Sequence, residues 1–155
     1  MKSSLAITSV AILMMAFAIA CTDNRVYDRY AHTPVNGWEK NDTLVFNLQR
    51  MAVAGEYASE LGLRITNDYP FMGLTLIVEQ TVYPSHRQYV DTLNCKLMDV
   101  KGNSIGVGLS YHQYAFPIAT LSLHAADSIV VKVRHDMKRE ILPGISDIGY
   151  QLRRH

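Results

Sequence analysis

Apolar and polar residues alternate along much of the chain from Trp38 onward. Apolar side chains fall at every second position in 43–48, and the same period of two recurs in 60–66, 74–82 and 88–97. Alternation with this period is typical of β-strands that bury one face and expose the other. The pattern therefore predicts a protein built mainly from strands.

The alternation continues in the second half of the chain, where it predicts strands over 118–123, 128–135 and 145–152. Turn-forming residues separate the segments. Tyr83-Pro84-Ser85-His86 predicts a turn that joins its two flanking strands into an antiparallel hairpin, and residues 99–103 predict a second turn.

A further short strand is expected over 105–107. Gly106 and Gly108 interrupt it, which indicates a bulge or a close approach of another part of the backbone. Only residues 51–61 tolerate a helical pattern, and a glycine within them weakens it. About eight short strands with turns between them predict an all-β fold, an antiparallel β-sandwich of the jelly-roll or another Greek-key type.

The first residues form a separate apolar unit. Lys2 precedes an apolar stretch over 5–19, and small residues follow it directly before Cys21, which is the pattern of an export signal peptide. Small residues before a cysteine also predict a lipobox, in which the Cys21 thiol becomes a diacylglyceryl thioether. The alternative is an ordinary secreted protein with an incidental cysteine. A membrane-spanning helix would need roughly 20 apolar residues, more than this stretch has.

These features divide the chain into a lipoprotein signal peptide (1–20), a lipidated N-terminus with a tether (21–37) and a β-sandwich domain (38–155). The tether is polar, but it contains Tyr27 and Tyr30. Such aromatic residues are scarce in segments that stay disordered. We therefore expect the tether to dock on the domain.

Charge and cysteine content exclude several classes of protein. Lys2 lies in the signal peptide, so the mature chain has 14 basic and 14 acidic residues and a formal net charge of zero. Nothing in this balance attracts nucleic acid. Cys95 stands alone once Cys21 carries lipid, so neither an internal disulfide nor a cysteine metal site is expected. We expect Cys95 to be a small core residue, and we expect no metal and no cofactor.

The sequence carries none of the common catalytic motifs, such as a nucleophile elbow, a phosphate-binding glycine loop or a zinc-binding His-Glu-x-x-His. Two close pairs of histidine and acid, His135-Asp136 and His124 with Asp127, are typical of surface polar groups. A glycan-cleaving enzyme would need two convergent carboxylates, for which Glu79 and Asp91 across the predicted hairpin are candidates. We expect no enzymatic activity.

Two features are candidates for binding. Asn67, Asp68, Tyr69 and Phe71 lie in an unusual segment between two predicted strands, which either plugs the end of the sandwich or forms an interaction loop. Trp38 and the nine tyrosines could form a platform for stacking sugar rings, or could simply pack in the core and its rim. A carbohydrate-binding lipoprotein is therefore an alternative function.

Several blocks of sequence carry a family resemblance through their order and spacing. They are Cys21 with Asn24-Arg25-Val26-Tyr27-Asp28 and Tyr30; Trp38 with Lys40, Asp42 and Phe46; Arg64 to Phe71, leading to Leu74; Val90-Asp91-Thr92-Leu93; and Leu142 to Gly149. With these blocks the chain resembles GldH, the gliding-motility lipoprotein family of Bacteroidetes.

The resemblance implies an envelope lipoprotein associated with gliding machinery, which in this phylum is linked to an outer-membrane secretion system. It implies no enzymatic activity, and only Cys21 is carried over as a functional position. We therefore expect a scaffold or assembly component, held in the inner or outer membrane by the lipid on Cys21, with protein partners in an envelope complex. Residues 22–25 lack the acidic stretch of surface-exposed lipoproteins, so a periplasm-facing location is expected.

Overall fold

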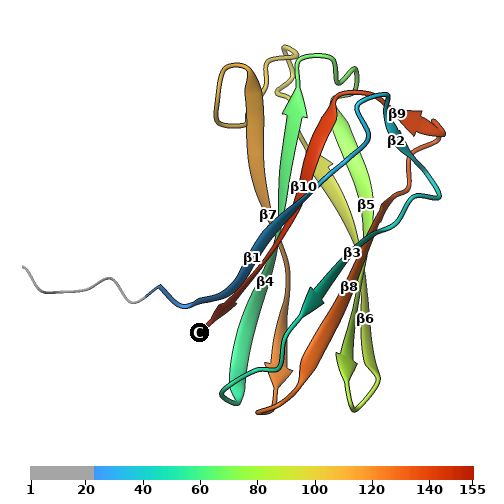
Figure 1. Ribbon diagram of the computed structural model, residues 1–155. Coiled ribbons are helices and arrows are strands. Elements are labelled where there is room, and N and C mark those ends of the chain that lie inside the picture. Colours follow the sequence, from blue (N-terminus) through green and yellow to red (C-terminus); the bar gives the residue numbers. More distant parts are fainter. Residues whose placement is uncertain (1–22) are drawn as a thin grey trace, which may run out of the picture.

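The computed structural model describes residues 23–155, so Cys21 and the signal peptide lie outside the described part. Strands account for all of its regular structure (Figure 1). The ten strands are β1 Arg25–His32, β2 Trp38–Glu39, β3 Leu44–Leu48, β4 Gly55–Thr66, β5 Gly73–Tyr83, β6 Arg87–Lys96, β7 Tyr111–Leu123, β8 Ser128–His135, β9 Ile141–Leu142 and β10 Ile145–Arg154. Residues 23–155 contain no helix that could cross a membrane.

Two antiparallel four-stranded sheets face each other. The first has the order β1-β10-β4-β7 and the second the order β3-β8-β5-β6, while β2 and β9 form a small separate pair. The β5–β6 hairpin stays within one sheet, and every other long strand is followed by a long strand of the opposite sheet. This is the strand order of a jelly roll. The predicted antiparallel β-sandwich is therefore confirmed.

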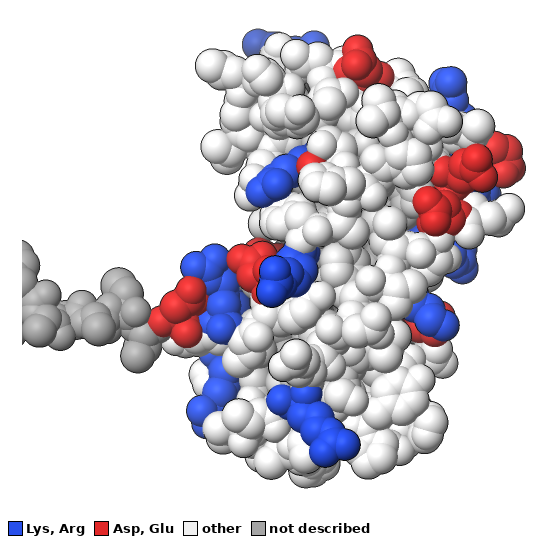
Figure 2. Space-filling view, viewed as in Figure 1, with Lys and Arg blue, Asp and Glu red and all other residues white. Residues whose placement is uncertain are grey.

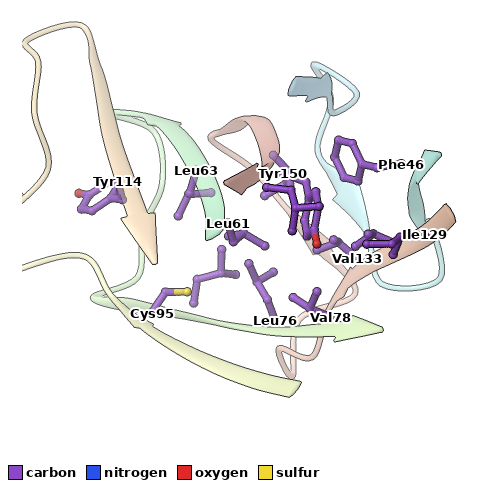
Figure 3. Packing of buried hydrophobic residues seen from close by; sticks show 14 of the residues in the cluster. Phe46, Leu61, Leu63, Leu76, Val78, Cys95, Tyr114, Ile129, Val133 and Tyr150 are labelled. Atoms are coloured by element: carbon purple, nitrogen blue, oxygen red, sulfur yellow. The ribbon is translucent and has the colours of Figure 1, made fainter. Parts of the chain in front are cut away.

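The core lies between the sheets and follows the predicted alternation. Leu61 and Leu63 on β4 and Leu76 and Val78 on β5 are all fully buried. Figure 3 shows the β4 residues pointing across the intersheet space toward the β5 residues. Cys95 on β6 belongs to the same core, with 2% of its surface exposed, as its predicted role as a small core residue requires.

Two local expectations need correction, and a third is confirmed. Most of the segment that tolerated a helical pattern, 51–61, belongs to β4. The strand expected over 105–107 is absent from the described residues, where Val107 makes only an isolated bridge to Gln113. The expected close backbone approach does occur at Gly108, because a Cβ there would collide with the carbonyl oxygen of Tyr111.

Strand β7 is longer than the pattern predicts, because it continues through Pro117. Pro117 lies opposite Glu60 of β4, beside a shift in register. Proline has no N–H to donate and is tolerated in edge strands and at bulges. Strand β7 is the last strand of its sheet, so Pro117 costs it no hydrogen bond to a further strand.

The predicted tether contains a full strand of the first sheet. Strand β1 pairs with β10 from Arg25, opposite Arg153, to His32, opposite Asp147. Tyr27 and Ala31 of β1 pack against the core. The tether therefore docks, as its aromatic residues indicated, and the sandwich extends N-terminally beyond the expected boundary at Trp38.

Candidate functional site

The strand register gives the sandwich two distinct ends. We call the end where Arg25 pairs with Arg153 the N-terminal end, and the end where His32 pairs with Asp147 the distal end. Tyr111, the first residue of β7, also lies at the distal end, because it pairs with the last residue of β4. Seven steps of about 3.4 Å along β1 place the two ends about 24 Å apart.

The predicted lipidation site, Cys21, lies outside the described residues, which begin with Asp23 at the N-terminal end. Arg25 forms an ion pair with Asp23 at 2.7 Å, and its Nε also donates a hydrogen bond to Asp23 Oδ1 at 2.8 Å. This guanidinium holds the pKa of Asp23 below its usual value. Because β1 begins at Arg25, only a short stretch of chain separates Cys21 from the folded sheet.

A wide groove opens beside this point, with a volume of about 1010 Å³. Residues 25–29 of β1 and residues 47–53 line it, together with Asp23, Tyr57 and Arg154. Arg25 lies in the groove but is neutralised by its ion pairs with Asp23 and Asp28. The remaining basic residues of this surface, which we call the arginine groove, are Arg29, Arg50 and Arg154.

The candidate interaction loop predicted from the sequence lies at the distal end. Two of its four residues, Tyr69 and Phe71, pack against each other, and Tyr69 is buried in the fold. Tyr69 is 3% exposed, its hydroxyl donates a 2.8 Å hydrogen bond to the Gly73 carbonyl, and its ring meets the edge of Phe71. The plug interpretation therefore describes Tyr69. Asn67 and Asp68 are the exposed members of the set, and the Asn67 Oδ1 already forms a 2.9 Å hydrogen bond with His112 Nε2.

The larger exposed apolar surface at the distal end lies in residues 98–111, which we call the apolar loop. The exposed fraction is 90% for Val100, 81% for Val107 and 91% for Leu109, and about half of Ile105 and Tyr111 is exposed as well. Figure 1 shows this loop leading from β6 to β7 at the end of the sandwich away from the N-terminal trace. Sequence reasoning missed this surface because Ile105 and Val107 alternate as in a half-buried strand.

Hydrogen bonds hold the apolar loop in place. The Asp99 carboxylate accepts hydrogen bonds from the backbone N–H groups of Lys101 at 2.8 Å and Asn103 at 2.9 Å. At the base of the loop, the Tyr114 hydroxyl donates to the Leu97 carbonyl at 2.9 Å. The exposed apolar side chains are thus presented on an ordered backbone, which reduces the entropy lost when a partner binds.

The predicted sugar platform is wrong for Trp38. This side chain is fully buried, its indole N–H donates to the Asp42 carbonyl at 2.8 Å, and its ring meets His135 edge-on at 5.2 Å. Tyr57 and Tyr150 are buried as well. Rings in these positions offer no face on which a sugar could stack.

The side chains of residues 23–155 do not form a recognisable catalytic or metal-binding arrangement. No group of three or more possible metal ligands occurs in this part of the chain. Asp91 pairs with Val78, whereas Glu79 pairs with Val90, so the two candidate carboxylates project to opposite faces of their sheet. They cannot converge on one glycosidic bond.

The arrangement that most resembles a catalytic triad has its groups in the wrong order. Ser146 donates a 2.5 Å hydrogen bond to Oδ2 of the buried Asp147, and His32 contacts Oδ1 of the same carboxylate. A serine nucleophile needs the imidazole beside its own hydroxyl, with the carboxylate behind the imidazole. Here the carboxylate separates the two groups, so His32 is not placed to take the proton of Ser146.

Comparison with known proteins links the chain to one family. The sequence model of the GldH lipoprotein family matches residues 25–152, from β1 to β10. The gliding motility lipoprotein GldH of Flavobacterium johnsoniae is 27% identical over 158 residues, which cover 94% of each chain. The GldH homolog of Christiangramia forsetii is 22% identical and covers 98% of this chain, with 97% of its own length aligned.

Solved structures show only distant likeness. The GH115 4-O-methyl-α-glucuronidase BtGH115A matches 84% of this chain with 18% of its own, at 13% identity and a TM-score of 0.44. Likeness at this level carries no argument about function.

Proposed function

The chain belongs to the GldH family of gliding-motility lipoproteins, and from this premise we propose that it is a lipid-anchored, non-enzymatic component of the cell envelope. In this proposal the thiol of Cys21 carries the lipid, and the sandwich faces the periplasm from the inner or outer membrane. The domain serves as a scaffold or assembly component of gliding-linked or secretion-linked machinery.

The observation that carries the proposal is the pairing of β1 with β10 along its whole length. An anchor at Cys21 acts on a strand that is already part of the sheet. The domain is therefore held at the membrane by its N-terminal end, and the distal end with the apolar loop is directed away from that attachment. This geometry suits a protein that presents a contact surface at a set distance from a membrane.

The apolar loop supports the choice of a protein partner. Exposed apolar groups gathered in one place typically mark an interaction surface. Val100, Val107 and Leu109 are each at least 81% exposed. Only Asp99 and Lys101 bring charge into the loop. We propose that the partner covers these side chains with an apolar surface of its own.

Membrane fractionation in the native host tests the anchor. We expect Cys21→Ala to move the protein from the membrane pellet to the soluble fraction after a high-salt wash, with an unchanged melting temperature. The control is Cys95→Ala, which removes the other cysteine and should leave the protein in the pellet. A washed pellet that retains Cys21→Ala would contradict lipidation at this residue.

Affinity purification from the native envelope tests the scaffold role. Tagged protein should co-purify gliding or secretion components, and Val107→Asp with Leu109→Asp should remove them without unfolding the domain. The matched control is Val35→Asp, which alters a fully exposed valine outside the loop. If the double variant captured the same components as the unaltered protein, the apolar loop would not be the contact surface.

A further inference from the structure

The arginine groove has an excess of basic residues, whereas the mature chain as a whole is balanced. The groove holds four arginines and two aspartates, and both aspartates pair with Arg25. Within residues 23–155, Arg29, Arg50 and Arg154 make no ion pair through their side chains. Four arginines against two aspartates give the groove a formal net charge of +2, and Arg29, Arg50 and Arg154 lie outside the ion pairs.

The groove lies close in sequence to the predicted lipid anchor, and this position indicates what its charges can contact. Asp23 lines the groove and is two residues from Cys21 in the sequence. Two residues span at most about 7 Å. A lipid on Cys21 therefore holds the Asp23 edge of the groove close to the lipid headgroups, whatever path the intervening chain takes. Figure 2 shows blue and red side chains together at the point where the described chain begins, and blue side chains below it on the same face.

We propose that the arginine groove binds the phosphate headgroups of the membrane in which the protein is anchored. This inference rests on the proposed lipidation of Cys21. Guanidinium groups match phosphate because their planar fork can donate two parallel hydrogen bonds. The contact joins Arg29, Arg50 and Arg154 to the membrane surface and so fixes the tilt of the sandwich, which a single flexible attachment would leave free.

The apolar groups beside the arginines fit the same occupant. Val26 and Val53 also line the groove, and 48% and 44% of their surfaces are exposed. Segments that lie at a membrane interface combine basic groups for anionic lipids with apolar groups that reach the acyl boundary. A site for a small soluble phosphate would have no use for these valines, which favours the lipid surface.

Reconstitution of the natively acylated full chain tests the proposal. Vesicles of phosphatidylcholine alone are compared with vesicles that also contain phosphatidylglycerol, and amide hydrogen exchange is followed in residues 47–53. We expect exchange there to be at least about tenfold slower on the anionic vesicles, with the difference lost at high salt because the contact is electrostatic. Flotation with the neutral vesicles reports the lipid anchor separately.

Two sets of variants identify the residues responsible. Arg29→Gln, Arg50→Gln and Arg154→Gln together should bring exchange on anionic vesicles back to the neutral-vesicle rate. Lys132→Gln, Arg134→Gln and Arg139→Gln remove the same charge elsewhere and should leave the slowing intact.

Several results would overturn the inference. Equal exchange rates on both kinds of vesicle would do so, as would slowing that survives in the groove variant. Equal slowing by inorganic phosphate on neutral vesicles would show a site for free phosphate instead of a membrane contact. Failure to float with neutral vesicles would contradict the lipid anchor itself and remove the basis of the groove proposal.

Discussion

The hydroxyl group of Tyr150 donates a 2.6 Å hydrogen bond to Oε1 of Gln80 in the middle of the core. Tyr150 belongs to β10 in one sheet and Gln80 to β5 in the other, and both side chains are fully buried. The bond is thus a polar link between the two sheets inside a predominantly apolar core. Burial also raises the pKa of Tyr150 above its usual value, which keeps the donor protonated.

We predict that Tyr150→Phe lowers the free energy of unfolding by about 1–3 kcal/mol, because it leaves the buried Gln80 oxygen without a donor. Chemical denaturation measures this change. The Gln80 amide nitrogen already has no hydrogen-bond partner within residues 23–155, so replacing both polar groups removes a desolvated amide as well.

The double variant Tyr150→Phe with Gln80→Leu should therefore be more stable than Tyr150→Phe alone. Replacing both partners of a buried hydrogen bond with apolar groups of similar shape is often close to neutral. A double variant that is less stable than the single one would show that the unpaired Gln80 amide is not the source of the loss in Tyr150→Phe.

The second prediction concerns Gly144. Its backbone φ is +78°, and it lies against the Tyr69 backbone. A Cβ at this position would come within 2.7 Å of the Tyr69 Cα. We expect Gly144→Ala to combine left-handed strain of about 1–2 kcal/mol with displacement of the distal-end plug. Thermal denaturation should show a large loss of stability.

Gly102→Ala is the matched control. Gly102 has a similar φ of +83°, but a Cβ there would meet nothing within 4 Å. This variant carries only the left-handed strain, so we expect Gly144→Ala to be at least about 2 kcal/mol less stable than Gly102→Ala. Equal losses would mean that contact with Tyr69 does not matter.

The strands that line the core could be predicted because one face of each strand packs in the core and takes apolar residues, while the other face is more exposed and takes polar ones. Leu61, Leu63 and Ile65 alternate in the sequence and are buried in the structure. Residues 105–107 alternate in the same way, yet Ile105 and Val107 stay exposed. Alternation shows that a segment is able to bury one face. It does not show whether a neighbouring strand is available to complete the sheet.

The surroundings of the candidate sites could not be predicted, because they form by pairing between parts of the chain that are distant in the sequence. Tyr27 and Tyr30 indicated that the N-terminal segment docks, but its partner β10 lies at the opposite end of the sequence. The same limit applies to Trp38, since the ring that fits a sugar platform by composition is fully buried and packs against His135, 97 residues further along the chain. Arg50 and Arg154 likewise share a groove with β1 only because of the jelly-roll order.

His135 makes the stability of the protein sensitive to acid. Burial lowers its pKa below the usual value, and the nearby Lys40 charge acts in the same direction. The ring lies 3.2 Å from the Trp38 carbonyl through Nε2, and Nδ1 accepts a hydrogen bond from the Met137 N–H. The folded state therefore favours the neutral imidazole.

The unfolded chain takes up a proton at this histidine near pH 6.5, before the folded protein does. The unfolded state thus binds more protons below that pH, and stability falls as the pH drops from about 6.5 to the lower pKa of the folded state. Urea denaturation at a series of pH values measures the slope. His135→Gln should flatten it, while His86→Asn, which removes an exposed histidine, should leave it unchanged.

The last prediction concerns the thiol of Cys95, which is 2% exposed and whose pKa burial raises to about 12. Thiol reagents attack the thiolate, so at pH 8 we expect Cys95 in the folded protein to react at least ~1,000-fold more slowly than an exposed cysteine. Unfolding in urea should make it fully reactive.

The number of thiols in the unfolded protein then tests the lipid anchor by a route independent of sedimentation. The sequence has two cysteines, and a thioether on Cys21 leaves only Cys95 free. Protein from the native host should therefore titrate as a single thiol in urea, and Cys95→Ala should titrate as none. Two thiols in the unfolded protein, or fast reaction of Cys95 in the folded one, would contradict this account.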